Sequence, residues 1–149
     1  MARRKAPSAA EGKRFGTTTI TPEKSQFDIQ GVLTKYGVEA SQWTMLADRW
    51  VLRFRLNERN YLFTIRKDEN DPQEVRRLFR VLFWYLDTLL AAFDSDLFTP
   101  EKVLLAFAEV APDVTMHEAM ESSNGYAGLR TALGGAPLML EAGNARVSD

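Results

Sequence analysis

The chain has 149 residues, of which 45% are hydrophobic and 26% charged, which is the composition of one domain with a single core. It contains no cysteine, which excludes disulfides, thiolate nucleophiles, zinc fingers and iron–sulfur clusters. The net charge is −1, but residues 1–15 hold five basic residues and one acid, whereas residues 94–149 hold three basic and nine acidic residues. Such asymmetry bears on partners and not on fold.

Residues 1–15 are small, polar and cationic, and they predict a disordered basic arm. A solvated tail that only aids solubility explains the same composition. The arm lacks the apolar core of a signal peptide. The longest apolar run, residues 78–93, contains Arg80 and Asp87 and is shorter than a membrane span. We therefore expect a soluble, cytoplasmic protein. The cations of the arm are Arg3, Arg4, Lys5, Lys13 and Arg14.

A first helix is predicted over residues 22–36. Thr21 suits the N-cap, and Pro22 suits the first helical position, where its missing N–H costs nothing. Apolar residues then recur at helical spacing as far as Tyr36, and Gly37 supplies a left-handed stop.

Three β-prone runs between residues 42 and 66 predict an antiparallel meander. Turns centred on Ala47–Asp48 and on Glu58–Arg59 pair apolar residues on one face, such as Phe54 with Phe63. Neither turn has the glycine that a two-residue hairpin prefers, so longer loops could change the register. The division into two faces depends only on the period of two. The second face collects Gln42, Thr44, Arg49, Val51, Arg53, Arg55, Leu62, Thr64 and Arg66.

A long helix is predicted to begin near Pro72, with an apolar stripe that should pack on the apolar sheet face. Trp84 lies on the opposite side of this helix, flanked by Arg77 and Arg80 and beside Phe83. It could be an exposed contact, or later helices could wrap round and bury it as core. Those later helices would include Val103, Leu104 and Phe107. The stripe is Val75, Phe79, Leu82, Leu86, Leu89, Leu90 and Phe93.

The C-terminal part predicts a helix from residue 100 to about 110 and helical pieces around residues 116–120 and 126–133. We expect one domain over residues 16–140 and a frayed tail over 141–149. The fold class is thus α+β: a helix, a three-stranded antiparallel meander, a long helix packed on the sheet, and short C-terminal helices.

No pattern of residues predicts catalysis. His117 is the only histidine, and the glycine-rich segment GYAGLRTALGGAP lacks the Gly-Lys-Ser/Thr of a phosphate loop. Asp87, Asp94 and Asp96 could hold Mg²⁺ if they converged, which leaves a metal-dependent hydrolase as a third hypothesis. Acids in a loop after a helix more often face solvent, so we expect no catalytic residue, no cofactor and no metal.

Two surfaces remain as candidate binding sites. One is the sheet face with Arg49, Arg53, Arg55 and Arg66, joined by the basic arm, which suits a nucleic-acid strand unless acids such as Asp48 and Glu58 neutralise it. The other is the helix face formed by Arg77, Arg80, Phe83 and Trp84, because Trp and Arg are enriched at protein interfaces. An exposed Trp84 with neutralised sheet arginines would favour a protein partner. A buried Trp84 with a bare basic sheet would favour nucleic acid.

The segments TPEKSQFDIQGVLTKYG and RWVLRFRLNERNYLFTI precede an arginine-rich apolar helix and a short tail. In this order they resemble a widespread family of small uncharacterised bacteriophage and prophage proteins, over residues 17 to about 110. Three departures are Glu58, where the family turn has Asn-Gly-Arg, Arg66–Lys67, where Leu-Pro often closes the strand, and Trp84 in the long helix. The resemblance implies a phage or prophage setting, in the cytoplasm of a bacterial host, and no catalytic residues.

Together these observations predict a non-enzymatic phage accessory protein that binds nucleic acid through the arginine-rich sheet face and the basic arm. The alternative is a protein-interaction module that uses the Trp84 helix face to bind a host or phage protein or to self-assemble into a homo-oligomer.

Overall fold

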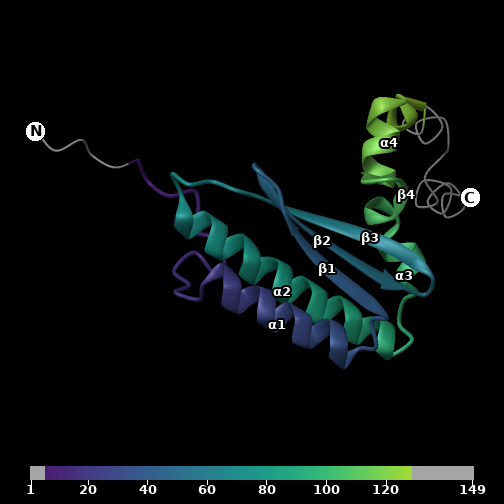
Figure 1. Ribbon diagram of the computed structural model, residues 1–149, viewed down its shortest axis with the longest axis horizontal. Coiled ribbons are helices and arrows are strands. Elements are labelled where there is room, and N and C mark those ends of the chain that lie inside the picture. Colours follow the sequence, from purple (N-terminus) through teal and green to yellow (C-terminus); the bar gives the residue numbers. More distant parts are fainter. Residues whose placement is uncertain (1–5, 129–149) are drawn as a thin grey trace, which may run out of the picture.

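The computed structural model describes residues 6–128 and shows an α+β fold (Figure 1). Helix α1 (Pro22–Lys35) precedes an antiparallel sheet of three strands in the order β1 (Ala40–Met45), β2 (Arg49–Leu56) and β3 (Arg59–Arg66). The long helix α2 (Pro72–Asp94) follows. The chain then forms α3 (Pro100–Val103), a 3₁₀ turn (Leu105–Phe107), a hairpin of β4 (Glu109–Ala111) and β5 (Val114–Thr115), and α4 (Met116–Ser122). The predicted fold class is confirmed.

Helices α1 and α2 lie side by side, run in the same direction, and cover one face of the sheet (Figure 1). Each begins at a capping side chain: Thr21 accepts a hydrogen bond from the N–H of Lys24, and Asp71 accepts one from the N–H of Glu74. After α1, Gly37 adopts φ +74°, the conformation in which a side chain would be strained. The start and stop predicted for the first helix are therefore confirmed.

The hydrophobic core lies between these helices and the sheet. Six of the seven residues in the predicted stripe of α2 are buried, and Phe93 packs against them while half-buried. Phe79 lies under two tryptophans of the sheet, with ring centroids 5.8 Å from Trp43 and 5.3 Å from Trp50. Each side chain buried in this way contributes roughly 1.5–3 kcal/mol, so the stripe holds the long helix on the sheet.

The register of the sheet agrees with the prediction in the first hairpin and differs in the second. Trp43 pairs with Leu52 as expected, but Phe54 pairs with Tyr61 and not with Phe63. The second turn is centred on Asn57 and Glu58, which adopt φ +51° and +65°, as both central residues of a type I′ hairpin must. The shift equals two residues, so every side chain stays on its predicted face.

The predicted helix from residue 100 to about 110 is wrong. Helix α3 ends at Val103, and the chain then pairs with the sheet through a bridge between Ala108 and Tyr61. The β4–β5 hairpin turns at Asp113, which has φ +59°. Pairing at the edge of β3 thus competes successfully with helix formation. The piece around residues 116–120 is helical as expected, whereas residues 129–133 and the tail over 141–149 lie outside the described residues.

The described part of the predicted disordered arm differs from that expectation. Residues 6–15 form turns against the start of α2, where the Ser8 hydroxyl donates to Asp71 Oδ1 at 2.6 Å and the Ala9 N–H donates to Oδ2 at 2.8 Å. Ala10 is fully buried in this contact. Arg3, Arg4 and Lys5 lie outside the described residues.

Candidate binding face of the sheet

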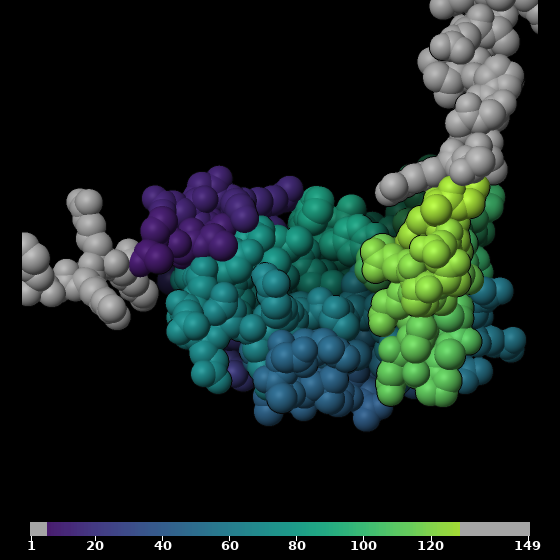
Figure 2. Space-filling view, turned by 90° about the horizontal axis from the view of Figure 1, so that it is seen from above, coloured from purple at the N-terminus to yellow at the C-terminus, as the bar shows by residue number. Residues whose placement is uncertain are grey.

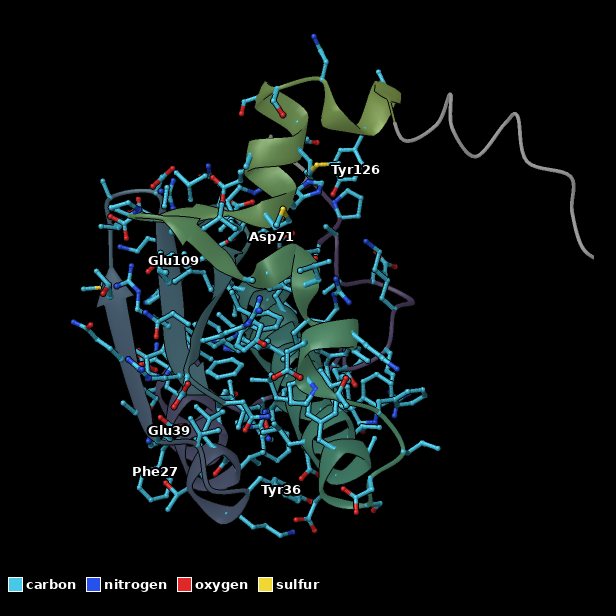
Figure 3. All side chains as sticks on the ribbon, turned by 90° about the vertical axis from the view of Figure 1, so that its right-hand side faces the viewer. Phe27, Tyr36, Glu39, Asp71, Glu109 and Tyr126 are labelled. Carbon is cyan, nitrogen blue, oxygen red and sulfur yellow. The ribbon has the colours of Figure 1, made fainter. Side chains whose placement is uncertain are left out.

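The arginine-rich face of the sheet points away from the two long helices, and the C-terminal hairpin partly covers it. Figure 3 shows the β4–β5 hairpin lying across the strands at one end of the sheet, with Glu109 beside them. Phe107 anchors this segment by stacking on Phe63 with ring centroids 4.3 Å apart. Acidic side chains of the hairpin are thereby brought to a face that the strands alone would make basic.

Arg53 fastens the hairpin to the sheet. Its Nη2 donates to Glu109 Oε2 at 2.8 Å and its Nε donates to the same oxygen at 3.3 Å. A third hydrogen bond runs from Nη2 to Asp113. These bonds, with that to Glu109 the stronger, raise the pKa of Arg53 above its ordinary value, so the guanidinium is fixed as a cation between two carboxylates.

Two further sheet arginines also meet acids. Arg49 lies 3.4 Å from Asp48 and Arg55 lies 3.4 Å from Glu39, and all four side chains are close to half-exposed or more. Such exposed pairs add at most about 1 kcal/mol to stability, yet they cancel local charge. Of the four predicted arginines, Arg66 alone makes no ion pair with another residue in the range 6–128.

A recess of about 470 Å³ lies between the outer face of the sheet and the C-terminal elements. Figure 2 shows these elements, in green to yellow, as a ridge beside the rest of the molecule. Leu46, Val51 and Leu62 supply apolar surface, while charges of both signs surround it. The complete lining is Thr44, Leu46, Arg49, Val51, Arg53, Leu62, Thr64, Asp113 and Glu118.

The helix face proposed from the sequence does not form one binding surface. Arg80 is only 7% exposed and donates to Ser25 Oγ at 2.8 Å and to Asp28 Oδ2 at 2.7 Å. Arg77 forms two hydrogen bonds, of 2.7 and 2.8 Å, to the carboxylate of Glu74. Both arginines therefore serve the fold, joining α1 to α2 or stabilising the first turns of α2.

Trp84 remains 40% exposed, so it is not buried as core by the C-terminal helices. The guanidinium of Arg14 lies 4.2 Å from its ring centroid, a cation–π contact worth about 0.5–1 kcal/mol when exposed. This contact places Arg14 on the helix side of the molecule. The basic N-terminal segment, as far as the structure describes it, therefore does not extend the arginine face of the sheet.

The remaining candidates for chemistry are dispersed. Within residues 6–128, no three histidine, aspartate or glutamate side chains gather closely enough to hold a metal ion, and this includes Asp87, Asp94 and Asp96. His117 contacts the Tyr126 hydroxyl at 2.8 Å and Glu121 at 3.3 Å. None of the helices described is long and apolar enough to cross a membrane.

Comparisons with known proteins give no match. No family model matches the chain, and no curated protein and no solved structure matches it significantly. The resemblance to phage and prophage proteins stays a prediction from the sequence.

Proposed function

We propose that this chain is a non-enzymatic protein-interaction module whose recess on the outer sheet face binds a short segment of a partner protein. The proposal rests chiefly on the neutralised arginine face. Arg53, Arg49 and Arg55 are each paired with an acid, and the hairpin that supplies the acids bound by Arg53 also forms a wall of the recess. If the phage or prophage setting holds, the partner is a host or phage protein.

The recess has the mixed chemistry of a site for polypeptide. Leu46, Val51 and Leu62 can bury an apolar side chain, because they form the apolar part of the lining. Arg49 and Glu118, which also line the recess, offer a donor and an acceptor to backbone or charged groups of a bound segment. Interfaces commonly combine such an apolar centre with a polar rim.

Nucleic acid remains the alternative proposal, but the geometry supports it less. A phosphate strand laid on this face would meet Glu109, Asp113 and Glu118 together with the arginines. Binding to phosphates draws its free energy from cations that neutralise them and release counterions. Of the four predicted sheet arginines only Arg66 makes no ion pair within the described residues, so little of that free energy is available on this face.

Filling the recess tests the proposal directly. Peptides would be selected from a random display library on immobilised protein, and their affinities measured by fluorescence anisotropy for the wild type, Thr64→Trp and Thr88→Trp. Thr64 is exposed and lines the recess, while Thr88 is exposed on α2, away from it. We expect Thr64→Trp to weaken the selected peptides by about tenfold or more, equal to about 1.4 kcal/mol, and Thr88→Trp to leave them unchanged.

Equal binding by the wild type and Thr64→Trp would show that the recess is not the site. The same anisotropy assay with single- and double-stranded oligonucleotides across a salt series separates the alternative. Tight binding that weakens steeply with salt and drops in Arg66→Ala would favour nucleic acid over a protein partner.

A further inference from the structure

The two edges of the sheet differ in how they are covered. The outer edge of β3 is bridged at Tyr61 by Ala108. No strand lies beside the outer edge of β1 among residues 6–128. An uncovered edge offers unpaired N–H and C=O groups to another strand, so natural proteins protect such edges with charges, prolines or bulges.

Strand β1 has none of these protections. Its six residues read ASQWTM, without a charged residue, a proline or a glycine, and its ladder with β2 is regular from Ala40 to Met45. The strand is therefore uncharged and regularly paired along its length, so its free edge can accept another strand. An unprotected edge of this kind would lead to uncontrolled aggregation unless it is covered by a specific partner strand.

Exposed apolar side chains lie on the same side of the molecule as this edge. Phe27 on α1 is 73% exposed, and Met45 at the end of β1 is 70% exposed. The hydroxyl of Ser41 on β1 donates to Gln30 on α1 at 2.8 Å, which places the Phe27 turn of α1 next to the strand. Figure 3 shows Phe27 pointing outward on the side where Glu39, just before β1, also lies.

We propose that a second copy of this chain pairs with the β1 edge and forms a two-fold symmetric dimer with one continuous sheet. The N–H of Leu46 donates to the C=O of Arg49 at 2.8 Å. Because the backbone groups of successive residues point alternately toward and away from the neighbouring strand, those of Ser41, Trp43 and Met45 point away from β2, to the open edge. Antiparallel pairing centred on Trp43 then sets Ser41 opposite Met45 of the partner subunit. The partner is a copy of this chain because two-fold pairing sets no like charges opposite one another and brings the exposed Phe27 and Met45 of each copy toward the other copy.

This arrangement brings the exposed apolar residues together. Two residues of strand, from Ser41 to the dyad at Trp43, span about 6.6 Å, which corresponds to about four residues of helix. Gln30 on α1 contacts Ser41. The dyad is level with a point about four residues before Gln30 along α1, which is within about one helical turn of Phe27. The two copies of Phe27 therefore lie near each other across the axis, and Met45 is covered by the partner subunit. The dimer does not rest on the proposed use of the recess.

The oligomeric state of the intact chain tests this inference. In a concentration series by sedimentation equilibrium, we expect a mass about twice 16.9 kDa for the wild type. Phe27→Glu sets two carboxylates near the axis and should raise the dimer Kd at least about tenfold, with the far-UV spectrum and the melting temperature of the monomer retained. The matched control Leu97→Glu alters a 67% exposed leucine after α2 and should stay dimeric.

Hydrogen exchange supplies the second readout. The amides of Ser41, Trp43 and Met45 should be protected in the wild type and should exchange faster in Phe27→Glu. A wild type that is monomeric throughout the series overturns the inference. So does a dimer that survives Phe27→Glu, or one whose three edge amides exchange freely. Peptide binding in the recess should be unchanged in Phe27→Glu, so failure of the dimer and failure of the proposed function are distinguishable.

Discussion

Replacing Arg80 with methionine would remove the guanidinium that joins α1 to α2. Arg80 donates to Ser25 and Asp28 on α1 and lies 4.5 Å from the ring centroid of Phe83. Methionine keeps the unbranched apolar stem, so packing changes little. The free energy lost on substitution therefore reports the polar contacts between the two helices.

The size of the loss follows from what the substitution leaves behind. Ser25 is fully buried, and a buried hydroxyl without its partner costs about 1–3 kcal/mol. Asp28 loses a charged hydrogen bond worth about 1.5–3 kcal/mol, but it is 21% exposed and keeps Lys24 at 2.7 Å. Because of that residual pairing, we expect a loss of about 3 kcal/mol near neutral pH, at the lower end of the roughly 3–5 kcal/mol that breaking a buried pair costs.

The loss should depend on pH in a direction that the structure fixes. Hydrogen bonds from Lys24 and then Arg80 lower the pKa of Asp28 in the folded state. The ionised carboxylate therefore stabilises the fold above its unfolded pKa, and this stabilisation disappears as the pH falls through the lowered folded value. The difference between the wild type and Arg80→Met should shrink below about pH 4, leaving mainly the contribution of Ser25.

Urea denaturation followed by tryptophan fluorescence measures these differences, and Arg76→Met on the same helix is the control. Arg76 is half-buried, and within residues 6–128 its side chain hydrogen-bonds to Gln73 alone, at 3.1 Å, so its loss should stay below about 1 kcal/mol. A double-mutant cycle with Asp28→Asn should give a coupling energy of about 1 kcal/mol or more. The reasoning is refuted if Arg80→Met costs less than about 0.5 kcal/mol or if the coupling is zero. A loss of partner binding with stability intact would instead make Arg80 a contact residue.

Three further predictions concern the sheet. Glu58→Gly puts the Asn-Gly pair that a type I′ turn prefers at two positions of positive φ, and we expect it to stabilise the fold by up to about 1 kcal/mol in the urea assay; a destabilised variant would contradict the turn assigned. The Tyr61 hydroxyl is buried with no hydrogen-bond partner among the described residues, so Tyr61→Phe should leave stability unchanged or raise it by up to about 1 kcal/mol, and a clear loss would reveal an unrecognised bond. Arg53→Gln frees Glu109 and Asp113, which should speed amide exchange over residues 109–115 but not in α2; equal exchange in both would show that Arg53 does not hold the hairpin.

Local signals allowed the main elements to be predicted. The cap at Thr21, the stop at Gly37 and the stripe of α2 depend on neighbouring residues, so no tertiary knowledge was needed. The second hairpin register could not be predicted, because a shift by two residues leaves the apolar pattern unchanged. The C-terminal hairpin was missed because Ala108 pairs with Tyr61, a partner far away in the sequence.

The sequence predicted the sheet side of the candidate site but not the hairpin side. The alternation of side chains along a strand placed Arg53 on the correct face. Its partners Glu109 and Asp113 lie 56 and 60 residues away, and no local pattern links them to it. The pair of Glu74 and Arg77 was accessible, because residues three apart on a helix face each other. Recognising that pair would have removed Arg77 from the proposed binding surface.

The pairing of Arg53 also explains why counting arginines misjudges this face. A phosphate that approaches Arg53 must displace Glu109 or Asp113, exchanging one anionic partner for another. The displaced carboxylate then remains near the phosphate and repels it, so the exchange gains little free energy. A polypeptide segment in the recess makes no such demand, because it can use the apolar surface of Leu46 and Val51 while the Arg53 bonds stay intact. The contact that holds the recess together thus disfavours the nucleic-acid ligand that the arginines alone predicted.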